Sequence, residues 1–254
     1  SHQKEAWQRF LILARGGWMG EAQVELDLLP TPITLEGRVI WAKIWASVFG
    51  YVKTFEILSS VWQDDPSYLS PTLLKIAYPK EFWSLVEAES KRTKLSPLVV
   101  LSLIRQESSF RVDVTSPANA MGLMQILPPT AKEIAQDMRL KAYVNAQDLF
   151  NPTTNVKIGT TYLARLMRIF NGHLPLALAS YNAGMGNVRG WLQARSDLKD
   201  LSSQKSTQIQ AEIWFDELPW SETSGYVKSI LRNILIYQYL DQGAQELKEP
   251  FWQF

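Results

Sequence analysis

Residues 96–131 read SPLVVLSLIRQESSFRVDVTSPANAMGLMQILPPTA, and the first third of this stretch has the pattern of a short amphipathic helix. Ser96 and Pro97 are typical of an N-cap and a first helical position. Glu107 falls on the apolar face of this helix, which is formed by Val100, Leu103 and Ile104. Burial and a place in the last helical turn both disfavour an ionised carboxylate, so we predict a raised pKa for Glu107. A carboxylic acid that stays protonated near neutral pH can donate a proton. The alternative interpretation is that Glu107 only ends its helix and reaches solvent.

Four motifs occur in order along the rest of the chain. They read ESSF from Glu107, followed by SPANAMGLMQ and PPTA; DLFNP from Asp148; ASYNAG from Ala179; and ELPWSET from Glu217. Together they resemble the signature of the soluble lytic transglycosylases, which cleave the glycan strands of peptidoglycan. The resemblance implies a mainly α-helical, goose-type-lysozyme-like catalytic domain.

The first part of the chain also has helical periodicity. Two short apolar-faced segments end at Gly16-Gly17 and at Pro30. A third runs from Trp41 through Val52, and a fourth, from Thr54 to Trp62, stops at Asp64-Asp65-Pro66. Such a succession is typical of the end of an α-helical repeat array, and the resembling family carries a helical superhelix before its catalytic domain. We therefore expect a partial superhelical segment over 1–78 and a catalytic domain over 79–254.

The N-terminal tryptophans have two interpretations. Their helical spacing favours packing in a core, while stacking of indole rings on sugars is the alternative. A small β element around Ser116 to Gln125 is a further expectation, although strand signals are few.

Most glycosidases use two carboxyl groups, one on each side of the scissile bond, yet the motifs supply only one such carboxyl group. The resemblance implies that Glu107 acts first as acid and then as base, with the substrate's N-acetyl group assisting, to leave a 1,6-anhydromuramoyl end. Asp113 is the second carboxylate that a hydrolytic muramidase would need, and a surface loop position is the alternative for it. A protein that binds peptidoglycan without cleaving it is the third possibility.

The resemblance also implies substrate-binding positions at Ser108, Met124, Gln125, Tyr181, Asn182 and Glu222. Several of them have a structural alternative: Ser108 as a local cap, Met124 as a core residue, and Asn182 as a residue that holds its turn. Glu217 is a weaker candidate than Glu222 for an acidic position at the cleft. A second carboxylate close to Glu107 would raise its pKa further.

Three positions depart from the family pattern. Asn119 stands where a glycine is usual, and asparagine tolerates a left-handed backbone better than most residues. Pro129 replaces a common glycine or serine and should stiffen its loop. Ser224 stands where an arginine is common, so a contact made by that arginine is expected to be missing.

Composition excludes several other classes of protein. The 254 residues carry a net charge of +1, which gives no field suited to nucleic acid. There is no cysteine, and the two histidines, His2 and His173, are too far apart to form a zinc site, so neither metal nor cofactor is expected. No apolar run is long enough to span a bilayer. A peptidoglycan partner implies the bacterial periplasm or cell envelope, although the chain shows no secretory signal.

Overall fold

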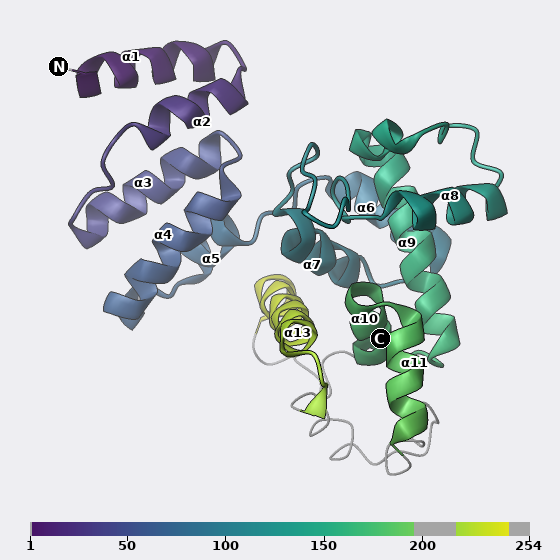
Figure 1. Ribbon diagram of the computed structural model, residues 1–254. Coiled ribbons are helices and arrows are strands. Elements are labelled where there is room, and N and C mark those ends of the chain that lie inside the picture. The colour runs from purple at the N-terminus through teal and green to yellow at the C-terminus, as the bar shows by residue number, and fades with distance from the viewer. Residues whose placement is uncertain (1, 196–216, 244–254) are drawn as a thin grey trace. The chain divides into compact units, whose positions relative to one another are not determined.

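The computed structural model describes residues 2–195 and 217–243, and most of these residues lie in α-helices (Figure 1). The prediction of a mainly α protein is therefore confirmed. The chain divides into two compact units, Ser1–Pro79 and Lys80–Phe254. Within the described ranges, no helix is both long and apolar enough to cross a membrane.

The first unit is built from helical hairpins. Its helices are α1 (His2–Arg15), α2 (Met19–Asp27), α3 (Leu35–Ser47), α4 (Tyr51–Asp64), the short 3₁₀ helix η1 (Pro66–Tyr68) and α5 (Pro71–Ala77). Helix α1 packs against α2, and α3 packs against α4 and, with α4, against α5 (Figure 1). Helical pairs of this kind bury one apolar face each against a neighbour, as in repeat proteins.

Tryptophans form much of the core of this unit. The side chains of Trp41 and Trp45 are buried, and the ring of Trp7 stacks on that of Trp41 with 6.3 Å between centroids. Core packing is thus the role of these three rings. Trp18 differs, because 63% of its surface is exposed.

The third helix is shorter than its sequence predicts. The pattern from Trp41 through Val52 indicates one segment, but α3 ends at Ser47 and Val52 belongs to α4. Phe49 adopts a left-handed backbone with φ of 61°, and a Cβ on Gly50 would lie 2.5 Å from the Trp45 ring. The close approach of Gly50 to Trp45 allows the sharp turn that the apolar periodicity conceals.

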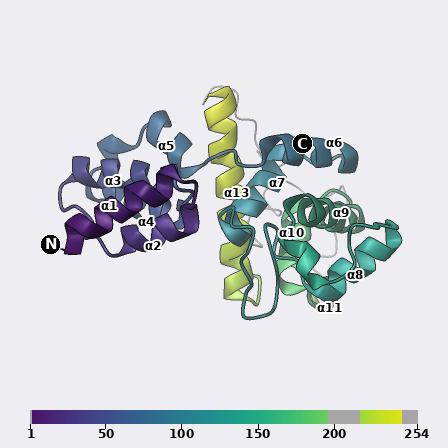
Figure 2. The same cartoon turned by 90° about the horizontal axis from the view of Figure 1, so that it is seen from above.

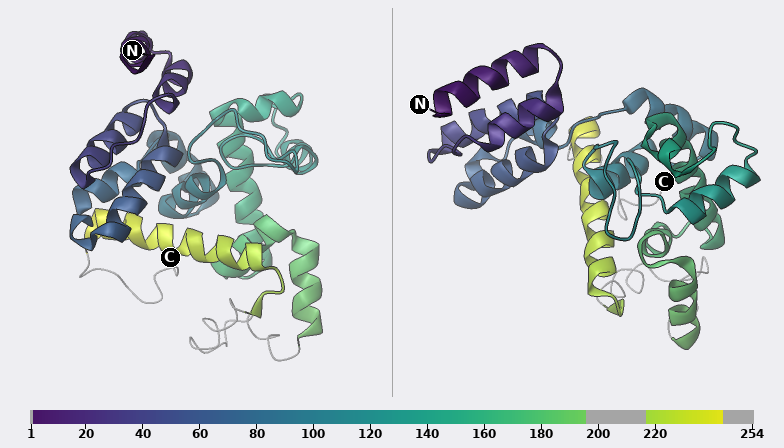
Figure 3. Two further views of the ribbon diagram at one scale, coloured as in Figure 1. Left: turned by 60° about the vertical axis from the view of Figure 1, so that its left-hand side comes forward. Right: turned by 45° about the horizontal axis from the view of Figure 1, so that its top comes forward.

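The second unit surrounds a buried central helix, α7 (Pro97–Ser108). The other helices are α6 (Trp83–Thr93), α8 (Pro128–Asp137), the 3₁₀ helix η2 (Ala146–Phe150), α9 (Pro152–Ile169), α10 (Leu174–Ala183), α11 (Met185–Ala194) and α13 (Ser221–Gln242). Helix α13 runs alongside α7 (Figures 2 and 3) and also contacts α10, which packs on α9. Every residue from Val99 to Ile104 is buried.

The segment between α7 and α8 contains bridges rather than strands. Two isolated antiparallel bridges pair Met121 with Thr115 and with Ile126, so the expected β element is limited to these pairs. Asn119 has φ of 65°, which confirms that asparagine accepts the left-handed turn here. Pro129 lies in the first turn of α8, where proline lacks only a hydrogen bond that the helix start leaves unmade.

Candidate active site

Glu107 lies in the last turn of α7, and Ser108 separates it from the two residues that end the helix. Ser109 and Phe110 have φ of 49° and 67°, and this double left-handed turn redirects the chain. Burial raises the pKa of Glu107 from 4.5 to about 7, and a hydrogen bond from Tyr226 opposes the rise. The carboxyl group is therefore poised to hold or release a proton near neutral pH.

Tyr226 of α13 is the hydrogen-bonding partner of this carboxyl group. Its hydroxyl donates to Oε1 of Glu107, and the Tyr226 side chain is 7% exposed. Burial first, and then the charge of Glu107, raise the pKa of Tyr226 well above 10. The phenol therefore remains a proton donor at every pH at which Glu107 titrates.

Tyr181 of α10 lies close enough to the same carboxyl group to be affected by its charge. Burial and then the charge of Glu107 raise its pKa well above 10. Its hydroxyl donates to the carbonyl oxygen of Met124 at 2.8 Å, and its ring packs on Tyr162 with 5.2 Å between centroids. Tyr181 thus joins α10 to the segment that carries the Gly-Leu-Met-Gln motif.

The other side of the Met124 peptide is held by Asn155, a fully buried residue of α9. Its Oδ1 accepts from the Met124 amide at 2.8 Å, and its Nδ2 donates to the carbonyls of Met121 and Leu149 at 2.9 and 2.8 Å. The residue before Gln125 is thereby fixed at both its amide and its carbonyl. We call this arrangement of Asn155, Tyr181 and Met124 the Met124 clamp.

Glycines allow this segment to lie close to its neighbours. Gly122 has φ of 74°, and a Cβ there would be 2.2 Å from the Leu149 carbonyl. A Cβ on Gly159 of α9 would be 2.4 Å from the sulfur of Met124. Both glycines are needed where the backbone approaches another group.

Gln125 follows the clamp in a strained conformation with φ of 47°. Its side-chain amide donates to the carbonyls of Val114 and Gly122 at 3.1 and 2.8 Å. The side chain is partly exposed. Gln125 therefore holds the bridged segment together while part of its surface faces solvent.

Two of the residues named from the sequence face the protein interior. The buried Ser108 hydroxyl donates to the Ile104 carbonyl at 3.2 Å, which is a bond within its own helix rather than to Glu107. The Met124 side chain is fully buried against Gly159. Packing against α9 removes the thioether from the surface, which agrees with the alternative of Met124 as a core residue.

The last two named positions lie where α10 ends and α13 begins. Asn182 is exposed and its Oδ1 accepts from the Thr223 hydroxyl at 2.7 Å, a bond that links the two helices. Glu222 is exposed in the first turn of α13, and burial alone, without a neighbouring carboxylate, raises the pKa of Glu107. Asp113 is exposed in the loop after α7. The structure thus brings Tyr226 and Tyr181 to Glu107, and Gln125 directly follows the residue that Tyr181 binds.

The sequence analysis assigned no role to Tyr226 or Asn155, although each lies three residues after the end of a motif. Each carries a polar group on an otherwise buried helical face, since Tyr226 stands between Thr223 and Val227, and Asn155 precedes Val156. A polar side chain in such a position needs a buried partner. The sequence could therefore have indicated that each side chain has a buried hydrogen-bonding partner. Which residue is the partner depends on the tertiary fold.

Comparison with known proteins places these features in a family. Residues 84–203 match the family model described as the transglycosylase SLT domain. The chain is 32% identical over 181 residues to the soluble lytic murein transglycosylase of Salmonella typhimurium, an alignment that covers 71% of this chain and 26% of that protein. The chain thus spans about a quarter of the length of the curated relatives that it matches first.

Solved structures share the fold. The 70 kDa soluble lytic transglycosylase of Escherichia coli superposes with a TM-score of 0.76 at 24% identity, covering 100% of this chain and 38% of that one. An inactive mutant of the lytic transglycosylase Slt from Pseudomonas aeruginosa gives a TM-score of 0.73 at 26% identity, covering 94% and 36%. The chain therefore contains a transglycosylase SLT domain over residues 84–203 and shares the fold of the soluble lytic transglycosylases.

Proposed function

We propose that this protein is a peptidoglycan lytic transglycosylase in which Glu107 is the catalytic acid and base. One observation carries the proposal: the Glu107 carboxyl group is half-buried at the end of α7, has its pKa raised to about 7 by desolvation, and accepts a hydrogen bond from Tyr226. A group with a pKa near the working pH is suited to donate a proton and then take one back. The relatives named lytic murein transglycosylases support the choice of substrate.

The proposed reaction needs only this one carboxyl group. Protonated Glu107 donates its proton to the glycosidic oxygen, and the bond between that oxygen and muramoyl C1 breaks. The acetamido oxygen of the same sugar stabilises the positive charge at C1. The Glu107 carboxylate then accepts the proton of the C6 hydroxyl while that oxygen bonds to C1. The products are a 1,6-anhydromuramoyl end and a free hydroxyl on the neighbouring sugar, and no water is consumed.

The hydrogen bond from Tyr226 has a defined part in this cycle. It stabilises the ionised form of Glu107, which exists between the two proton transfers. Burial stabilises the protonated form, which is required at the start. The two effects oppose each other and keep both forms accessible. The Met124 clamp would fix the backbone that presents Gln125 to the sugar next to the scissile bond.

The same proposal indicates where the protein acts and what each part of the chain does. Peptidoglycan as substrate would place the protein in the bacterial cell envelope, in agreement with relatives whose names include membrane-bound lytic murein transglycosylase C. We further propose that the boundary near Tyr78–Pro79 separates a helical-repeat segment from the catalytic domain. Gln125, Tyr181, Asn182 and Glu222 are proposed substrate-side residues.

Turnover of purified peptidoglycan by matched variants tests the proposal. Glu107→Gln keeps the size of the side chain and removes its proton, so release of soluble fragments should stop. Asp113→Asn serves as the matched control, because Asp113 is exposed in the loop after α7, and it should leave turnover unchanged. Turnover by Glu107→Gln at the wild-type rate would refute the role of Glu107, and loss of turnover in Asp113→Asn would favour a hydrolytic muramidase.

A further inference from the structure

A stripe of buried side chains runs along α13. Its members recur at alternating intervals of three and four residues: Thr223, Tyr226, Ile230, Asn233 and Tyr237. This spacing is typical of a helix that packs lengthwise on another helix, and α13 runs alongside α7 (Figures 2 and 3). Asn233 is fully buried in this stripe. Because a buried amide is unfavourable unless it is hydrogen-bonded, Asn233 needs partners in the interior.

Asn233 has two hydrogen-bonding partners on α7. Its Oδ1 accepts from the Arg105 guanidinium at 3.2 Å, and its Nδ2 donates to the Ser102 carbonyl at 3.4 Å. Ser102 is fully buried and Arg105 is partly buried. One side chain of α13 is thus bonded to α7 at two points, once to a side chain and once to the backbone.

These bonds and the bond from Tyr226 to Glu107 define the register of the two helices. Tyr226, near the start of α13, meets Glu107 in the last turn of α7. Asn233, further along α13, meets Ser102, which lies nearer the start of α7. The two helices are therefore antiparallel. Tyr226 and Asn233 are about two helical turns, or roughly 10 Å, apart along α13, so α13 is held on α7 at two separate places.

Apolar packing alone does not fix this register. The buried apolar side chains of α13 include Val227, Ile230, Leu231 and Ile234. Hydrophobic contact is non-directional, so α13 can move by a fraction of a turn along α7 with little loss of buried area. A hydrogen bond, in contrast, weakens steeply as its distance and angle depart from their optimum. Buried asparagines fix the register of paired helices in coiled coils for this reason.

We propose that Asn233 is a positioning residue that sets the register of α13 on α7 and thereby holds the Tyr226 hydroxyl against the Glu107 carboxyl group. The proposal rests on the proposed transglycosylase function, in which that carboxyl group transfers the proton. Among the described residues, the titratable groups coupled to Glu107 are Tyr226 of α13 and Tyr181 of α10. Of these two, Tyr226 is the one whose position depends on the register of α13.

Titration of the Glu107 carboxyl group tests the proposal without any substrate. NMR of a chain with ¹³C-labelled glutamate side chains gives its pKa, and Glu107→Gln assigns the signal. Asn233→Leu keeps the size of the side chain and removes both bonds. Because the bond from Tyr226 lowers the pKa of Glu107, we expect Asn233→Leu to raise that pKa by about one unit. If Asn233→Leu does not fold, Asn233→Ala, which leaves room for water at Arg105, should give the same rise.

A combined variant shows whether Asn233 acts through Tyr226. Tyr226→Phe alone should raise the pKa of Glu107. Asn233→Leu added to Tyr226→Phe should raise it no further, because the bond that Asn233 maintains is already absent. Additive shifts of the two substitutions would overturn the proposal, and so would an unchanged titration in the single Asn233 variants.

Two controls on α13 distinguish loss of register from loss of stability. Ile234→Ala removes buried apolar contacts next to Asn233 in the chain and breaks no side-chain hydrogen bond. Asp241→Asn weakens the solvent-accessible ion pair with Lys80, at 2.7 Å, near the end of the helix. Neither substitution should move the Glu107 titration. A shift with Ile234→Ala equal to that with Asn233→Leu would mean that any weakening of α13 has this effect, and would overturn the proposal.

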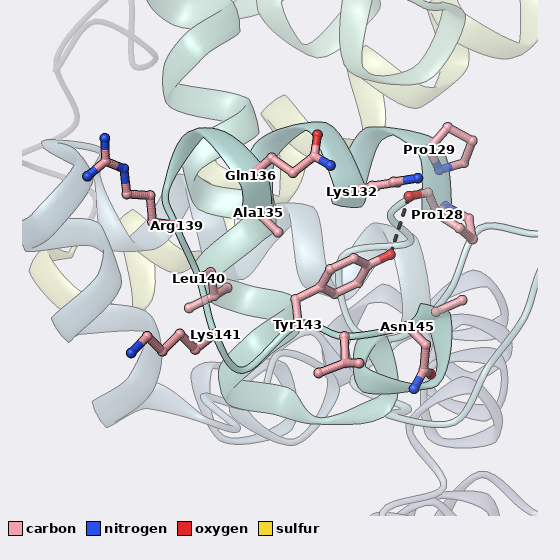
Figure 4. A pocket seen from close by; sticks show the side chains of 12 residues that line it. Pro128, Pro129, Lys132, Ala135, Gln136, Arg139, Leu140, Lys141, Tyr143 and Asn145 are labelled. Atoms are coloured by element: carbon pink, nitrogen blue, oxygen red, sulfur yellow. Dashed lines mark hydrogen bonds between the residues drawn. The ribbon is translucent and has the colours of Figure 1, made fainter.

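A third control removes a hydrogen bond far from α13 in the sequence. The Tyr143 hydroxyl donates to the Pro128 carbonyl at 3.4 Å, in a cavity between α8 and the loop that follows it (Figure 4). Tyr143→Phe removes this bond and should leave the Glu107 titration as in the wild type. A shift equal to that with Asn233→Leu would count against a role for the register of α13.

Titration and turnover together separate this proposal from the transglycosylase proposal. A raised pKa of Glu107 in Asn233→Leu, with no cleavage of peptidoglycan by the wild type, would support the positioning role and refute the transglycosylase function. Cleavage by the wild type, with the same Glu107 titration in Asn233→Leu, would overturn the positioning role alone.

Discussion

The hydroxyl group of Tyr226 donates a hydrogen bond to Oε1 of Glu107 and joins α13 to the end of α7 across 119 positions of sequence. This contact and the burial of Glu107 act in opposite directions on its pKa. The behaviour of the carboxyl group therefore depends on a helix that lies far from it in the chain.

Removing the Tyr226 hydroxyl should shift the pH dependence of activity. Because the hydrogen bond lowers the pKa of Glu107, Tyr226→Phe raises it, and the fall of kcat/KM above about pH 7 moves to higher pH. A pH profile on soluble glycan strands measures the shift. Tyr239→Phe, on the same helix, is the control and should keep the wild-type profile. A profile of Tyr226→Phe that shifts toward lower pH would contradict the assigned role.

Neutralising Glu107 should stabilise the fold at high pH. With a folded pKa of about 7 against 4.5, the folded chain binds more protons than the unfolded chain between these values, so the free energy of unfolding falls as the pH rises through them. We expect Glu107→Gln to exceed the wild type by about 1–3 kcal/mol at pH 8, and by much less below the unfolded pKa. Urea unfolding at both pH values measures the difference, and a pH-independent difference would argue against the raised pKa.

The Met124 clamp predicts unequal effects of substitutions at Asn155 and Tyr181, the two residues whose side chains hold Met124. Asn155→Leu leaves the Met124 amide and the Leu149 carbonyl buried without a partner, while the Met121 carbonyl keeps only its bond from the Ile126 amide. The loss should cost about 3 kcal/mol of unfolding free energy. Tyr181→Phe removes one hydrogen bond and should cost about 1 kcal/mol. Chemical denaturation of both variants checks the ranking, and a larger loss for Tyr181→Phe would show that the clamp is wrongly described.

Close packing predicts opposite signs for two glycine substitutions. Gly159→Ala puts a Cβ 2.9 Å from the Cβ of Met124 and should destabilise the chain by about 1–3 kcal/mol. Gly190→Ala, in α11 with nothing within 4 Å, should stabilise it by up to about 1 kcal/mol. Thermal unfolding of both variants gives the test. A neutral Gly159→Ala would mean that Met124 moves without cost.

The sequence predicted the helical class and the place of Glu107 because both depend on local periodicity. The helix that carries Glu107 begins at Pro97 as the Ser96-Pro97 pair indicates, and its buried residues extend around most of its surface. The prediction could not reach Tyr226, whose partner is 119 residues away, or the turn at Gly50, which depends on the Trp45 ring. It also left Met124 between a groove-lining and a core role, since a buried thioether and a groove-lining one have the same local pattern.

The mass of the new chain ends tests the central claim most directly. Strands cleaved in ¹⁸O-labelled water should end in 1,6-anhydromuramoyl groups, one water lighter than reducing ends and free of ¹⁸O, and these ends should be absent with Glu107→Gln. Reducing ends that carry ¹⁸O would contradict the account and establish a hydrolase.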